Sequence, residues 1–260
     1  MNYKFESRIE IRNNNNLPPP ADGIANQLDA LKNKTNSIII KKLIKDLANP
    51  DKTAREEAAS RLIKSGKEAL PYLIEALKDN QVNEEAASVL GKMGSAAKPA
   101  LIEALKSPDK NTRWFAVSAM QAIGPEITPD ILDAIKSNDK ILRKNALWAL
   151  GILQPKEKEI VPVITNALMD SDMGVKQHAA WVLSILDQDI KESMPNLFIA
   201  LESPNKALSR YAALAFGNIG IEAIPYLTKK LETANGTSVK NIKEALQIIH
   251  YNEEIKKMKN

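Results

Sequence analysis

The chain has 260 residues, of which 44% are hydrophobic and 26% are charged, a composition typical of a folded protein and not of a disordered or collagen-like one. It contains no cysteine, which excludes disulfides, thiolate catalysis and thiolate metal sites. The 36 basic and 32 acidic side chains are mixed along the chain, so the net charge of +4 is weak evidence for a nucleic-acid partner. No apolar run is long enough to cross a bilayer, and the N-terminus lacks a signal-peptide core, so we expect a cytoplasmic protein without a membrane partner.

The first part of the chain precedes any repeated pattern. Asparagine and proline dominate the stretch NNNNLPPPADG, which predicts a flexible segment over residues 1–21. Ile24, Leu28 and Leu31 then follow at helical spacing. Residues 22–36 are therefore expected to form a short helix that caps the open end of the array described next.

One segment type recurs seven times over residues 37–252. Each copy has an alanine at its sixth position and a large apolar residue four positions later, as Ala116 and Met120 illustrate. Residues four apart lie on one helical face, so each copy is predicted to be an amphipathic helix. The copies begin at Thr53, Gln81, Asn111, Ile141, Gly174, Ala207 and Lys240. Residues 253–260 follow the last copy and are expected to be a C-terminal tail.

A second segment type lies between these copies and carries a proline at a fixed place. Proline is tolerated in the first turn of a helix, where its missing N–H would have no partner, so each of these segments is predicted to be a second, shorter helix. The prolines are Pro71, Pro99, Pro129, Pro162, Pro195 and Pro225. Helix pairs of constant length joined by loops of variable length are typical of a stacked solenoid.

The turn inside each pair has an acidic residue four positions before a basic one. The pairs are Asp51 and Arg55, Asp109 and Arg113, Asp139 and Arg143, and Asp172 and Lys176. The aspartate is predicted to cap the following helix, and the basic residue of the next repeat to pair with it, forming a ladder between neighbours. Asn205 and the shortened turn at Asp79 are expected to interrupt this ladder.

The segment AREEAASRLIKSGKEALPYLIEALKD and its copies resemble the short HEAT-like repeat first named from phycobilisome (PBS) lyases. The resemblance rests on the Arg, Ala-Ala, Leu, Gly and Pro pattern. It implies an all-α, right-handed α-solenoid of about seven helix pairs. It also implies that the proline helices lie on the convex side and the Arg-Ala-Ala helices line the concave side.

The exposed face of the Arg-Ala-Ala helices changes character along the chain. Helical periodicity places positions 1, 4, 5, 8, 11 and 12 of each copy on this face. Copies one and two present Glu56, Glu57, Glu84 and Glu85 there, whereas copies three to six present aromatic and basic residues, with Asn145 among them. The predicted partner-binding residues are Trp114, Phe115, Lys144, Trp148, His178, Trp181, Arg210 and Tyr211. Trp, Tyr and Arg are the residue types that anchor protein interfaces, although packing of the rings between neighbouring repeats remains an alternative.

No catalytic chemistry is evident. The two histidines, His178 and His250, belong to no metal-binding motif, and no phosphate-binding glycine loop occurs, so we expect no cofactor and no metal. The leading hypothesis is a non-enzymatic scaffold or adaptor that holds a protein or peptide in the concave groove.

Two other functions stay open. One is a phycobilin lyase or bilin chaperone of the E/F type, in which Lys144 and Arg210 would meet the propionates of the tetrapyrrole. The other is a nucleic-acid binder or a glycosylase similar to HEAT-like repair enzymes. The glutamates of copies one and two make the last of these less favourable, because they would repel phosphate.

Overall fold

A computed structural model describes residues 22–259, and the predicted flexible segment 1–21 lies outside the described residues. The chain divides into two units between Lys42 and Leu43. All regular elements in the described part are helices, which confirms the all-α solenoid. The right-handed twist remains a prediction.

The first helix, α1 (Asp22–Asp46), differs from the prediction. It continues without a break through the boundary expected between residues 36 and 37. The stretch KNKTNSIII contains neither glycine nor proline to end a helix, which explains the continuity. The predicted capping helix and the first helix of the first pair are therefore one element.

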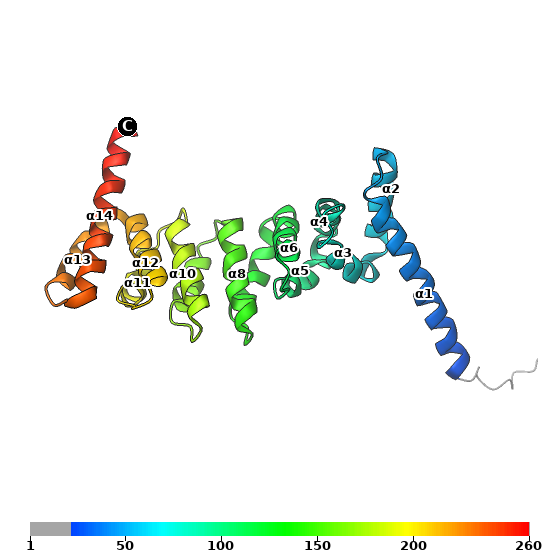
Figure 1. Cartoon of the computed structure of the whole chain (residues 1–260), viewed down its shortest axis with the longest axis horizontal. Coiled ribbons are helices and arrows are strands. Elements are labelled where there is room, and N and C mark those ends of the chain that lie inside the picture. The colour runs from blue at the N-terminus through cyan, green and yellow to red at the C-terminus, as the bar shows by residue number, and fades with distance from the viewer. Residues whose placement is uncertain (1–21, 260) are drawn as a thin grey trace, which may run out of the picture. The chain divides into compact units, whose positions relative to one another are not determined.

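The second unit consists of helices of the two predicted kinds in alternation (Figure 1). The Arg-Ala-Ala helices are α2 (Lys52–Lys64), α4 (Asn83–Lys92), α6 (Lys110–Ile123), α8 (Lys140–Leu153), α10 (Met173–Ile185), α12 (Lys206–Ile219) and α14 (Gly236–Lys259). The proline helices are α3 (Leu70–Ala76), α5 (Lys98–Ala104), α7 (Thr128–Ile135), α9 (Ile160–Ala167), α11 (Met194–Leu201) and α13 (Ile224–Leu231). Single 3₁₀ turns precede most of the proline helices, at Gly66–Glu68, Gly94–Ala96, Pro125–Ile127, Lys191–Ser193 and Gly220–Ala223.

The two kinds of helix form two layers. Each Arg-Ala-Ala helix from α4 onward packs against the next helix of its own kind, and the proline helices α3 to α11 do the same in the second layer. The sixth-position alanines and their apolar partners are all buried, each 2% exposed or less. Small side chains at these positions let neighbouring helices approach closely, and the large apolar residues fill the space between the layers.

The predicted caps are present. Asp51, Asp109, Asp139 and Asp172 each accept a hydrogen bond from a backbone N–H in the first turn of the following helix. Asn205 also caps its helix, because its Oδ1 accepts from Leu208 N. Asn205 therefore keeps the cap and lacks only the negative charge that the ladder of ion pairs would need. These caps fix where each helix starts, and therefore which side chains reach its exposed face.

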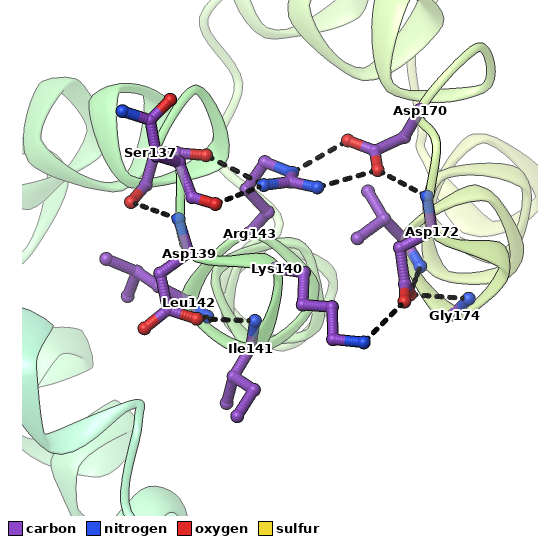
Figure 2. Close-up of polar contacts among 11 residues, drawn as sticks. Ser137, Asp139, Lys140, Ile141, Leu142, Arg143, Asp170, Asp172 and Gly174 are labelled. Carbon is purple, nitrogen blue, oxygen red and sulfur yellow. Dashed lines mark hydrogen bonds and ion pairs between the residues drawn. The ribbon is translucent and has the colours of Figure 1, made fainter.

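The predicted ladder between repeats is largely wrong. The guanidinium groups of Arg55 and Arg113 donate to carbonyl oxygens of their own turns. Arg143 does cross to the next repeat, but it pairs with Asp170 and not with a capping aspartate (Figure 2). Its Nε and Nη2 lie 2.7 and 2.8 Å from the two Asp170 oxygens, and the pair is largely buried. The predicted ladder pairs each basic residue with the capping aspartate of the preceding repeat, which for Arg143 is Asp109. The observed acidic partner instead belongs to the following repeat.

The predicted C-terminal tail is also wrong for the described residues. Helix α14 continues to Lys259, because EEIKKMK consists of good helix formers with no breaker. Glu253 and Lys256 form an ion pair one turn apart, with 2.8 Å between Oε1 and Nζ.

Candidate protein-interaction surface

The eight predicted binding residues come from four consecutive helices of one layer. Trp114 and Phe115 lie on α6, Lys144 and Trp148 on α8, His178 and Trp181 on α10, and Arg210 and Tyr211 on α12. Trp114 is 53% exposed, and the Arg210 side chain is 70% exposed. The other six side chains are half-buried. We call this set of eight residues the aromatic surface.

Ring contacts connect the members of the aromatic surface across helices. The centroids of Trp114 and Trp148 lie 6.3 Å apart, with their planes tilted by 47°. His178 meets Trp181 edge to face, also with 6.3 Å between centroids. A depression of about 250 Å³ opens between α8, α10 and α12. It is lined by Trp148, Gln177, His178, Trp181, Ala207 and Tyr211.

Packing between repeats accounts for part of this arrangement. The indole of Trp181 lies against Gly151 of α8, where there is no side chain to meet it. A Cβ atom at Gly151 would be only 2.3 Å from Cζ3 and 2.5 Å from Cη2 of the ring. Trp181 is therefore a packing residue on one side and a surface residue on the other, so both interpretations of the tryptophans apply to it.

The surroundings of His178 favour its neutral form. Its Nδ1 lies 2.8 Å from the carbonyl oxygen of Gly174, to which a protonated Nδ1 donates. Burial lowers the pKa of His178 below its ordinary value, and the positive charge of Lys144 lowers it further. With the proton on Nδ1, the Nε2 atom is a hydrogen-bond acceptor.

The interpretation of Asn145 as an exposed residue is wrong. Its side chain is only 9% exposed, and its amide donates a 2.6 Å hydrogen bond to the carbonyl oxygen of Leu105 in the preceding repeat. Asn241 makes the equivalent bond to Leu201 at 2.7 Å. Both asparagines satisfy a carbonyl at the C-terminal end of a proline helix, where no intrahelical donor is available.

Sequence reasoning also missed apolar residues beside the aromatic surface. Ile141 and Ile152, at opposite ends of α8, are 46% and 37% exposed. They occupy positions 1 and 12 of the exposed face, so helical periodicity was a sufficient signal for them.

Among residues 22–259, no group of three His, Cys, Asp or Glu side chains is placed to hold a metal ion. None of the helices described in this range has the length and apolar character to cross a membrane.

One protein family and several solved structures are similar to this chain. The sequence model of HEAT repeats matches residues 40–121, 78–133 and 128–197. No curated protein matches the chain. Among solved structures, importin beta is 14% identical over 81% of this chain and 33% of its own, with a TM-score of 0.49. Human deoxyhypusine hydroxylase is 16% identical over 86% of this chain and 98% of its own, with a TM-score of 0.39. A designed armadillo repeat protein in complex with the peptide (KR)4 is 18% identical over 80% of this chain and 98% of its own, with a TM-score of 0.40.

Proposed function

Because the chain belongs to the HEAT-repeat family, whose fold is typical of protein-binding scaffolds, we propose that it is a non-enzymatic scaffold that binds a protein partner on its aromatic surface. The observation that carries the proposal is the exposed indole of Trp114, 53% accessible and continuous through Trp148 with the rings on α10 and α12. Monomeric proteins rarely leave contiguous apolar patches exposed without a use.

The composition of the aromatic surface supports a protein partner. Tryptophan, tyrosine and arginine are enriched among the residues that contribute most to interfaces, because they bury large areas at a small cost in side-chain entropy. The half-buried rings of Trp148 and Trp181 are already ordered by their neighbours. A partner that covers them loses little additional conformational entropy.

A bilin is less well supported as the ligand. The depression beside Trp148 and Tyr211 has a volume of about 250 Å³. Pockets that enclose a drug-sized ligand measure roughly 300–1,000 Å³, and a tetrapyrrole needs the upper part of that range. Visible absorption of the protein purified from its source would be the expected result if the bilin function were correct.

The proposal is tested by affinity capture with quantitative mass spectrometry. The test variant is Trp114→Ala with Tyr211→Ala, which removes two anchors and avoids the packing contact of Trp181. The matched control is Ile199→Ala, which removes an exposed apolar side chain (55% accessible) from α11 in the other layer. We expect the variant to capture at least tenfold less of a partner protein than wild type and control do. Equal capture by all three proteins would contradict the proposed function, provided that circular dichroism shows all three folded.

A further inference from the structure

The exposed face of the Arg-Ala-Ala helices changes from negative to positive charge between α2 and α14. The fourth position of each Arg-Ala-Ala copy lies on the same face, so these residues form one row across the stacked helices. We call this set the fourth-position row. From α2 to α14 it reads Glu56, Glu84, Trp114, Lys144, Gln177, Arg210 and Lys243. Carboxylates occupy one end, cations the other, and the tryptophan lies between them.

The acidic end contains a second hollow. A depression of about 470 Å³ lies between α2 and α4 and is walled by Ala59, Ile63 and Val89. Its charged lining residues are Glu56 and Glu85 together with Arg55, Lys64 and Lys92. Glu84 and Glu85 have no ion-pair partner among the described residues, and Glu56 has only an exposed contact of 3.7 Å with Lys52. Arg55 donates to backbone carbonyl oxygens of its own turn, and Lys64 and Lys92 lie about two helical turns away from Glu56 and Glu84. The apolar walls and the unpaired carboxylates of Glu84 and Glu85 therefore suit the aliphatic stem and charged head of a lysine or arginine.

The basic end lies beside the aromatic depression. Lys144 and Arg210 come from the helices that line it, and Lys243 follows on α14. Arg210 has one ion-pair contact, 3.7 Å from Glu244, and is too exposed for this contact to neutralise it strongly. Burial lowers the pKa of His178, which disfavours a positive charge on its ring. A partner that presents an acidic side chain next to an aromatic one would therefore be complementary to this end of the row.

We infer that the partner presents an extended peptide with basic residues at one end and an aromatic, acidic cluster at the other, an inference that rests on the proposed function. Neighbouring helices pack roughly 8–10 Å apart, so the three steps from α4 to α10 span about 30 Å. An extended chain covers about 3.3 Å per residue, which places the two charged ends of the peptide about nine residues apart. A nucleic acid, uniformly negative, would be repelled by the glutamates.

The experiment uses the full chain and a displayed library of random peptides of ~16 residues, long enough for this span. Selected peptides are then synthesised and measured by fluorescence anisotropy at low and high salt. One variant reverses the acidic end, Glu84→Lys with Glu85→Lys, and a milder version carries Glu84→Gln with Glu85→Gln in case the first fails to fold. Another reverses the basic end, Lys144→Glu with Arg210→Glu. The control reverses two exposed charges off this face, Glu192→Lys with Lys229→Glu.

We expect wild type and control to select peptides with the two charged ends described. Each reversal should weaken binding about tenfold at low salt and less at high salt, and swapping the charge at the matching end of the peptide should restore it. If both reversals bind as wild type does while Trp114→Ala abolishes binding, the inferred charge pattern is wrong and the proposed function stands. If the library enriches no peptide, the inferred peptide ligand is contradicted, whereas the proposed function is decided by the affinity capture described above. If Trp114→Ala binds the selected peptides unchanged, both are contradicted.

Discussion

Adding one methyl group at Gly151 tests whether Trp181 is packed between repeats. The new Cβ would lie 2.3 and 2.5 Å from two ring carbons of Trp181, more than 1 Å inside ordinary carbon contact. The indole must therefore move away from α8. Overpacking of this kind costs roughly 1–3 kcal/mol, and the better helix propensity of alanine offsets about 1 kcal/mol of it. We expect Gly151→Ala to lower the free energy of unfolding by as much as about 2 kcal/mol.

The assay is thermal and urea unfolding followed by tryptophan fluorescence. A loss of about 2 kcal/mol in a chain of this length should lower the Tm by about 4–8 °C, and the emission of the displaced indole should shift. Gly174→Ala is the control, because its Cβ would meet no ring. The new atom would lie 3.2 Å from Cδ of the flexible Lys144 side chain and 3.0 Å from Oδ1 of the capping Asp172, so only small shifts are needed. Adding Trp181→Phe to Gly151→Ala should recover part of the loss. An alanine variant as stable as wild type, with unchanged emission, would refute the packing contact.

Three further predictions concern the caps and the ionisable groups. Asp170→Asn should cost about 2–3 kcal/mol, measured by urea unfolding, because it breaks the pair with Arg143. The hydrogen bonds from Arg143 lower the pKa of Asp170, so wild type should lose this stability as the pH falls below about 4, and the variant should not. The depressed pKa of His178 should make wild type less stable as the pH falls below about 6.5, with an NMR-detected pKa under that value, and His178→Gln should remove this dependence. Asp139→Ala should cost about 1 kcal/mol by losing the cap of α8, whereas the neighbouring Lys140→Ala should be nearly neutral in the same unfolding assay.

Periodicity made the fold predictable. The sixth-position alanines follow from the periodicity of a buried helical face, the prolines from the first turn of a helix, and the aspartates from N-terminal capping. Such rules act within one repeat and recur in each copy. The two layers, the helix starts and most of the exposed face therefore follow from the amino-acid pattern alone.

The errors concern contacts between repeats, for which the sequence carries no local rule. The sequence predicts that Arg143 pairs with the capping Asp109 of the preceding repeat, but Oδ2 of Asp109 accepts from the backbone and hydroxyl of Thr112. Arg143 instead binds both oxygens of Asp170 in the following repeat. Asn145 occupies a position that periodicity makes exposed, yet it turns to a carbonyl of the preceding repeat. The contacts between repeats depend on how far one helix is shifted along its axis relative to the next. A shift of one helical turn brings a different residue opposite each side chain.

The same limit explains why the tryptophans supported two interpretations. A large ring on the exposed face of one helix lies beside the next helix as well as beside solvent, and the residue on that next helix decides which contact dominates. Gly151 leaves space that Trp181 fills, whereas Trp114 keeps half of its surface accessible. Stability and binding are therefore coupled at Trp181 and separable at Trp114. Trp114 still contacts Trp148, but no neighbouring residue is shaped around its ring as Gly151 is around Trp181. For this reason Trp114 is the anchor whose removal reports most directly on the partner.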